Sequence, residues 1–118
     1  MSNPITEKMK TGTIGELLVQ LKLLEYGVQA SPPIKDTGND LIAIKGRIVK
    51  FVQVKTSKYR MPASRNLPNI YDLVCLVKLK IDPMGGRLLL DQSKIIVLEK
   101  YESEKSELNL ELVNRVWA

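Results

Sequence analysis

Three polar side chains in the middle of the chain are of types that bind metal ions and phosphate. Asp40, Gln53 and Lys55 are spaced as D-x12-Q-x-K. A carboxylate and an amide oxygen are hard ligands of the kind that Mg²⁺ accepts, with waters completing its coordination shell. A neighbouring ammonium group can orient a water or stabilise the charge that develops on a phosphate. This combination of side chains is suited to phosphodiester hydrolysis, provided that the fold brings the three together.

The segment that carries these residues has the pattern of a β-hairpin. Its apolar runs, which predict two strands, are 41–44 and 48–54. A tight turn at Lys45-Gly46-Arg47 joins the strands and returns Asp40 to the neighbourhood of the other two residues. Side chains alternate across a strand, so Gln53 and Lys55 point to one face and Val54 to the other. The hairpin therefore predicts a polar cluster on one face of a sheet.

The composition restricts the classes of protein and of site. A chain of 118 residues suits one domain, residues 1–118, with a core that needs no disulfide or structural metal. There is one cysteine and no histidine, which removes the ligands of Cys/His zinc sites and the base of His-dependent catalysis. The N-terminus has no signal-peptide pattern, and no apolar run approaches the roughly 18 residues of a membrane helix. We expect a soluble, cytoplasmic protein without membrane contact.

The basic residues are concentrated in the middle of the chain. The net charge is +5, and the segment 41–71 contains no aspartate or glutamate. Its basic residues are Lys45, Arg47, Lys50, Lys55, Lys58, Arg60 and Arg65. The segment from Glu99 onward is acidic by contrast. This asymmetry indicates a polyanionic partner for the middle of the chain, while a solvated basic strand face remains the alternative.

A helix must position the polar cluster from the N-terminal side. We predict it at 13–26, after a loose lead-in at 1–11 and before Gly27, a typical C-terminal stop. The apolar stripe that predicts it is Ile14, Leu17, Leu18, Leu21 and Leu24. Thr13 and Glu16 fit a capping box. Gly15 weakens a helix, and a close approach by backbone or ligand would explain it.

The remaining segments complete a sheet and add a second helix. The predicted strands are 28–30, the apolar central strand 71–79, and two short strands at 87–91 and 94–98 after a turn at 82–86. Residues 57–70 are expected to form an ordered loop or a short helix. From Ser103 a helix begins, capped by Ser103 or Ser106, with Leu108, Leu112, Val113 and Val116 toward the sheet. The order predicts an α+β or mixed α/β fold, a central mixed sheet flanked by helices.

The first half of the chain resembles the PD-(D/E)XK nuclease superfamily, which includes Holliday-junction resolvases and group I intron homing endonucleases. The resemblance rests on G-T-I-G-E at 12–16, G-N-D at 38–40 and V-Q-V-K-T-S at 52–57. It implies a restriction-endonuclease-like core. It also implies that Asp40 is the principal metal ligand, that Gln53 is a second ligand in a Q-x-K variant, and that Glu16 helps to bind metal or water. Lys55 would then position water or neutralise charge.

The resemblance extends to cofactor, substrate and assembly. It implies Mg²⁺, or Mn²⁺ in its place, and DNA cleavage by metal-activated water, on branched or specific duplex DNA. The residues that could contact phosphate are Lys50, Ser57, Lys58, Tyr59, Arg60 and Arg65. A homodimer or higher homo-oligomer would place two sites on two strands.

Other interpretations stay open. Asp40 could be a turn cap, Gln53 an edge residue, and Lys55 and the other basic residues plain surface groups. At the level of function, the alternatives are a nucleic-acid-binding module of the same fold that has lost cleavage, and a small structural partner protein without a nucleic-acid role.

Overall fold

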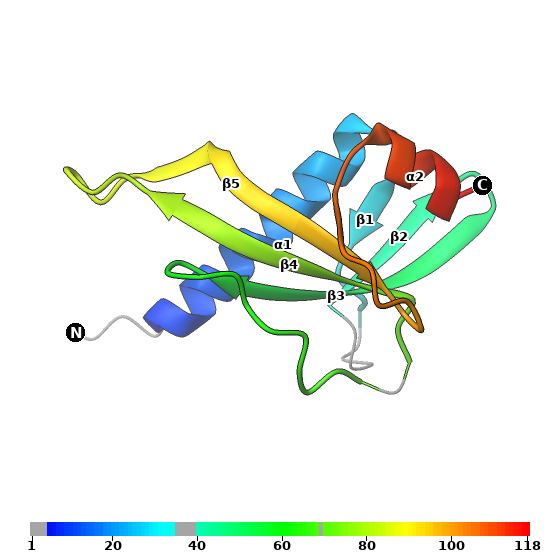
Figure 1. Cartoon of the computed structure of the whole chain (residues 1–118), viewed down its shortest axis with the longest axis horizontal. Coiled ribbons are helices and arrows are strands. Elements are labelled where there is room, and N and C mark those ends of the chain that lie inside the picture. The colour runs from blue at the N-terminus through cyan, green and yellow to red at the C-terminus, as the bar shows by residue number, and fades with distance from the viewer. Residues whose placement is uncertain (1–4, 35–39, 69) are drawn as a thin grey trace.

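The computed structural model describes residues 5–34, 40–68 and 70–118. Within them, six strands form one sheet that is accompanied by two helices (Figure 1). The elements in chain order are α1 (Glu7–Glu25), β1 (Gln29–Ser31), β2 (Leu41–Lys45), β3 (Ile48–Ser57), β4 (Leu73–Ile81), β5 (Leu88–Glu99), β6 (Ser106–Glu107) and α2 (Leu110–Val116).

The strands lie in the sheet in the order of the sequence. β3 and β4 run parallel, and every other neighbouring pair is antiparallel. The sheet is therefore mixed, and the predicted α+β class is confirmed. A parallel pair needs a crossover, which here is the long connection between Ser57 and Leu73. β4 lies between β3 and β5, as its nearly continuous apolar sequence predicts.

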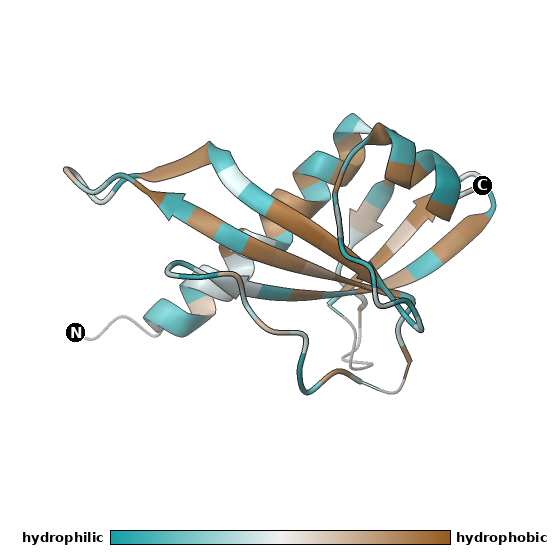
Figure 2. Cartoon of the chain, in the orientation of Figure 1, coloured by the Kyte–Doolittle hydropathy of each residue, from teal (hydrophilic) through white to brown (hydrophobic). Residues whose placement is uncertain are grey.

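One face of the sheet packs with both helices in a single core. Val52 and Val54 of β3 stand beside Leu73 and Cys75 of β4 on this face, and all four are buried. The helix residues in this core include Leu18, Val19 and Leu23 of α1, and Leu112 and Val113 of α2. The Trp117 indole N–H, just after α2, donates to the backbone oxygen of Ala43 at 3.2 Å. Hydrophobic residues dominate the middle of the strands, and polar residues interrupt β4 and β5 toward the turn that joins them (Figure 2).

The central hairpin has the predicted turn. Lys45 pairs with Ile48, so Gly46 and Arg47 form a two-residue turn between β2 and β3. Gly46 has φ of +62°, a conformation that glycine adopts without steric cost. The chain therefore folds back where the sequence indicates, and β2 and β3 pair from this turn to Leu41 and Val52.

The first helix begins earlier than predicted. α1 starts at Glu7, and the Thr6 hydroxyl caps it by accepting the Met9 backbone N–H at 3.1 Å. Thr13 and Glu16 lie in the helix interior, so the predicted capping box is wrong, and the predicted lead-in is wrong from Glu7 onward, while its first four residues lie outside the described part. Thr6 provides a cap one turn further out, and Glu16 thereby loses its expected structural role.

The predicted apolar stripe of α1 is also wrong in part. Leu18 is buried, and Ile14 is half-buried against the core. Leu17, Leu21 and Leu24 are exposed, with 57%, 49% and 61% of their surface accessible. The helix is apolar on more than one side, and periodicity alone does not say which side meets the sheet.

The C-terminal third differs from its predicted pattern in two places. The strands predicted at 87–91 and 94–98 are one strand, β5, with a register shift opposite Lys78 and Lys80. Ser93 supports this irregularity, because its hydroxyl accepts the Lys80 backbone N–H and donates to the Leu89 oxygen. The last helix begins at Leu110, capped by Asn109, whose side chain accepts the Leu112 N–H at 2.8 Å.

The predicted caps Ser103 and Ser106 are therefore wrong, since Ser106 lies in β6. Leu108, Leu112 and Val113 are buried and Val116 packs against the core, as predicted. The segment 57–70 contains no helix in its described part. None of the helices among the residues described is long and apolar enough to cross a membrane.

Candidate active site

The Asp40 carboxylate binds the backbone of β3 beyond its last described pair with β2. Leu41 pairs with Val52 at the start of β2, and β3 runs on to Ser57. The Val54 N–H donates to Asp40 Oδ2 at 2.8 Å. Val54 is flanked by Gln53 and Lys55, so this carboxylate lies against the backbone segment that carries both side chains. The hairpin thus returns Asp40 to the backbone beside Gln53 and Lys55, as predicted. The same bond also gives Asp40 a structural role as a strand-end acceptor.

Gln53 and Lys55 have the alternation predicted for them. Val52 and Val54 are buried on the core face, whereas Gln53 and Lys55 are half-buried on the opposite face. Gln53 Oε1 is buried, and no hydrogen-bond donor among the described residues reaches it. A buried oxygen without a donor is costly, on the order of 1–3 kcal/mol. Such an atom is suited to a ligand that accepts its lone pairs.

Helix α1 brings Glu16 to this segment through a close contact with β3. A Cβ placed on Gly15 would overlap the Thr56 hydroxyl and lie 2.8 Å from the Thr56 Cβ. Only glycine allows this approach, so a close neighbour does explain Gly15, but it is the Thr56 side chain and not the backbone or ligand that was expected. The contact holds α1 against β3 on the face to which Val54 and Thr56 point, whereas Lys55 points to the other face.

Two carboxylates interact at this site. Partial burial and the negative charge of Asp40 together raise the pKa of the Glu16 carboxyl above its usual range. Like charges held close together in a partly desolvated place disfavour the ionised form. A bound cation would relieve this repulsion.

The donor set of the site is entirely oxygen. The candidate donors are the carboxylates of Glu16 and Asp40 and the amide oxygen of Gln53, which are of the hard type that Mg²⁺ and Mn²⁺ accept. In the described part of the chain, no cluster of three or more acidic, histidine or cysteine side chains is arranged to hold a metal. The third candidate donor is an amide, and its oxygen is buried without a donor among the described residues.

The predicted phosphate-contacting residues lie in different surroundings, and of the six only Ser57, Lys58 and Tyr59 line one hollow together. Lys50 pairs with Ala43, so it lies on the core side of β3, opposite Gln53 and Lys55. Lys58 forms an ion pair with Glu7 at 3.3 Å. The Ser57 hydroxyl accepts the backbone N–H groups of Tyr59 and Arg60, which ends the strand in a turn. The side chains of Tyr59, Arg60 and Arg65 are exposed on the following loop.

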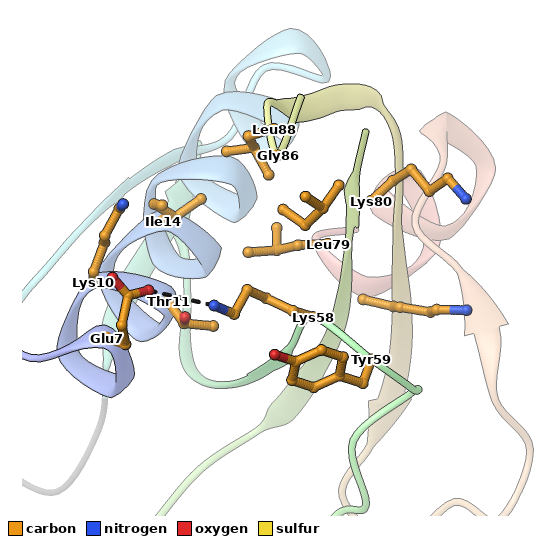
Figure 3. A pocket seen from close by; sticks show the side chains of 12 residues that line it. Glu7, Lys10, Thr11, Ile14, Lys58, Tyr59, Leu79, Lys80, Gly86 and Leu88 are labelled. Carbon is orange, nitrogen blue, oxygen red and sulfur yellow. Dashed lines mark hydrogen bonds and ion pairs between the residues drawn. The ribbon is translucent and has the colours of Figure 1, made fainter. Parts of the chain in front are cut away.

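Two hollows lie beside the site, between α1 and the far ends of the strands. One, of about 490 Å³, is lined in part by Lys55, Thr56 and Ser57 on β3 and by Lys8 and Thr11 on α1. The other, of about 560 Å³, lies between α1 and β4 (Figure 3). There the Lys58 ammonium points to Glu7 across the gap, with Tyr59 beside it. Of the four predicted site residues, Lys55 lines the first hollow, and Glu16, Asp40 and Gln53 line neither.

The fold has a counterpart among solved structures. A bacterial homing endonuclease, I-Ssp6803I, is similar to this chain with a TM-score of 0.52 over 87% of this chain and 75% of that one. The two sequences are 17% identical, so the likeness concerns the fold. The chain thus has an endonuclease-like fold, which confirms the predicted class.

Sequence comparison adds no relative. No family model matches the chain, and no curated protein matches it. The PD-(D/E)XK resemblance therefore rests on the motif residues, and the likeness to the solved structure concerns the fold alone.

The sequence analysis did not select some basic residues near the site. Lys8 and Lys10 of α1 lie in the part that was predicted as a loose lead-in. Lys78 and Lys80 interrupt the apolar sequence of β4 at a spacing of two. That spacing is the available signal, since it places two exposed charges on one face of a strand.

Proposed function

We propose that this protein is a Mg²⁺-dependent DNA endonuclease that hydrolyses phosphodiester bonds. The observation that carries the proposal is the mutual repulsion of the Glu16 and Asp40 carboxylates at a strand segment whose backbone binds Asp40 and whose Gln53 amide oxygen is buried without a donor. The endonuclease-like fold supports it, because the neighbour in that fold is a homing endonuclease. The PD-(D/E)XK resemblance assigns the same four residues.

Each residue has a separate task in this proposal. Asp40, already fixed by its bond to the Val54 N–H, holds the ion together with Gln53, and Glu16 completes the set. When bound, Mg²⁺ supplies positive charge at the scissile phosphate and makes a neighbouring water more acidic. The Lys55 ammonium forms no ion pair with a described residue, so it is available to orient the attacking water or to stabilise charge on the phosphate.

Two of these residues do not serve the stability of the empty fold. Repulsion from Asp40 and partial burial work against the charged form of Glu16. The Gln53 amide oxygen lacks a donor where it is buried. Such costs gather at functional sites, where a ligand compensates them.

Cleavage of DNA tests the proposal directly. Purified protein would be incubated with supercoiled plasmid, linear duplex and a four-way junction, in Mg²⁺ or Mn²⁺. We expect nicked or linear product, and we expect Lys55→Ala and Asp40→Asn to lower the rate by about 10²-fold or more. Lys105→Ala, on an exposed segment, is the control that keeps the rate. Folded protein that leaves every substrate intact in both ions would overturn the proposal.

A second candidate is a nucleic-acid-binding module of the same fold without cleavage. Gln53 favours it, because a neutral amide at this position lowers the negative charge available to a cation. It predicts salt-sensitive DNA binding that is unchanged by Lys55→Ala and is never accompanied by cleavage.

We also propose that the protein works as a homodimer or higher homo-oligomer. Two copies would place two sites on the two strands of a duplex. The exposed leucines of α1, Leu17, Leu21 and Leu24, supply an apolar strip for such contact.

A further inference from the structure

Four lysines lie on the sheet face that carries Gln53, and they extend from β3 across β4 to β5. Lys55 and Ser57 share this face on β3, and Ser57 is paired with Lys78 of β4. Lys78 is paired in turn with Lys94 of β5. We call Lys55, Lys78, Lys80 and Lys94 the lysine row.

The row points away from the helical core. In β4, Leu79 is buried while Lys78 and Lys80 on either side of it are exposed. Figure 3 shows Leu79 directed toward α1 and Lys80 directed to the other side of the strand. Neighbouring strands lie roughly 5 Å apart, so Lys94 stands about 10 Å across the sheet from Ser57. The row therefore continues the face of the candidate site for a further two strands.

The charges of the row are not compensated within the described protein. Lys78, Lys80 and Lys94 take part in none of the ion pairs that the described residues form. Like charges placed directly opposite each other on neighbouring strands are destabilising, and Lys78 and Lys94 are such a pair. A hollow of about 260 Å³ between them is lined by Lys78, Leu79, Lys80, Gln92 and Lys94, without an acidic residue. An anionic partner would attract both lysines and offset the repulsion between them.

We infer that the lysine row binds the phosphate backbone of duplex DNA. The bound duplex would run from the candidate active site over β4 and β5. The inference rests on the proposed function in one respect, namely that the bond to be cleaved lies at Lys55. Lysines bind phosphates as point charges without reading bases, so the row contributes affinity and orientation and leaves sequence preference to other contacts. The continuity of the row with Lys55 favours DNA over an anionic membrane surface.

Binding without cleavage tests the inference. The affinity for a short fluorescent duplex would be measured in EDTA at several KCl concentrations. The variants are Lys78→Gln/Lys94→Gln and the control Lys22→Gln/Lys105→Gln, which removes the same net charge outside the row. For Lys78→Gln/Lys94→Gln, the loss of two phosphate contacts should reduce the magnitude of the slope of log K against log salt by about 1.8. We also expect this variant to lose about tenfold or more in affinity at low salt. The control should lose little affinity and keep the slope.

The two proposals fail in different ways. If the wild type binds DNA through the row and never cuts, the endonuclease proposal fails and this inference stands. If the wild type cuts DNA but the row variant binds as tightly as the control, this inference is overturned and the endonuclease proposal stands. Row-dependent binding to phosphatidylserine-rich vesicles without binding to DNA would also overturn it. The row variant removes a like-charge pair, so it should unfold at a urea concentration no lower than the wild type does.

Discussion

Glu16 and Gln53 each carry a polar group in a place that the empty protein does not favour. The Glu16 carboxyl is partly buried beside Asp40, and the Gln53 amide oxygen is buried without a donor. Asp40 differs, because its bond to the Val54 N–H serves the hairpin as well. At the scale of single residues, these two polar groups thus lower the stability of the empty protein, and stability measurements can detect the loss.

Glu16→Gln should stabilise the metal-free protein at neutral pH. Burial and Asp40 raise the pKa of this carboxyl in the folded state above its ordinary value of 4.5. Folding therefore works against the charged form, and the penalty is present above the folded pKa. It fades as pH falls through that raised pKa, and it is absent below the unfolded value, where both states are protonated. Urea unfolding in EDTA between pH 4 and 8 measures the difference.

The exposed Glu104→Gln variant is the charge-matched control for this experiment. A Glu16→Gln protein that is less stable than the wild type at neutral pH would show that the carboxylate has a favourable partner instead.

Gln53→Met should remove both the free-energy cost of the buried amide oxygen and the proposed metal ligand. Methionine has a similar length and no polar group to leave unsatisfied, so the metal-free protein should gain about 1 kcal/mol. A ligand that binds only the folded state raises the melting temperature, and Mg²⁺ should do so for the wild type but less for this variant. Thermal melts with and without Mg²⁺ measure both effects.

For Gln53→Met, loss of stability combined with an unchanged response to Mg²⁺ would contradict a metal-binding role. Gln20→Met, on α1, is the matched control for the substitution itself.

At the scale of elements, the site depends on how closely α1 approaches β3. Gly15 and Thr56 touch where the helix crosses the strand, and these residues adjoin Glu16 and Lys55. The contact fixes the helix carboxylate relative to the strand. A longer side chain at Gly15 would displace the whole of α1 and not just one residue, because packed helices and strands move as units.

Gly15→Ala should destabilise the fold and displace Glu16. The added methyl would meet the Thr56 side chain at less than normal contact distance, and overpacking of this kind costs about 1–3 kcal/mol. Gly12→Ala is a matched control in the same helix, because nothing lies within 4 Å of its added methyl. It should be neutral or stabilising by up to about 1 kcal/mol. Denaturant unfolding of both variants measures the difference, and equal stabilities would show that the contact is not tight.

At the scale of the whole molecule, one side of α1 is exposed in the described part of the chain. Leu17, Leu21 and Leu24 are exposed on a helix whose other side is packed in the core. The molecule is elongated, with extents of 45 × 30 × 25 Å, and the β4–β5 turn and the N-terminal end of α1 lie together at one end of it (Figure 1). Association through the leucines would leave the lysine row, on the other face of the sheet, open to DNA.

Leu17→Gln/Leu21→Gln should reduce self-association. These side chains are exposed in the single chain, so their replacement should leave the fold intact while it removes apolar contact area from a dimer. Light scattering or sedimentation over a range of concentrations measures the mass. Leu110→Gln, an exposed leucine on α2, is the control. A wild type that is monomeric at all concentrations would contradict the proposed assembly.

The local pattern of the sequence was sufficient for several features. The turn at Gly46, the central apolar strand and the opposite directions of Val54 and its neighbours follow from chain geometry over a few residues. Asp40, Gln53 and Lys55 were selected differently, by their side-chain types and by the resemblance to a nuclease family, and their roles stay a prediction. Gly15 was recognised as a point of close approach, because glycine in a helix otherwise weakens it.

Only the tertiary structure decided which parts meet. It selected the side of α1 that packs on the sheet, since leucines on two sides of the helix satisfy the same period. It paired Lys78 with Lys94, and it brought Glu16 to Asp40 although the two are far apart in the chain. The physical reason is that periodicity determines the directions of side chains within one element, whereas the contacts between elements depend on register and packing over the whole sheet.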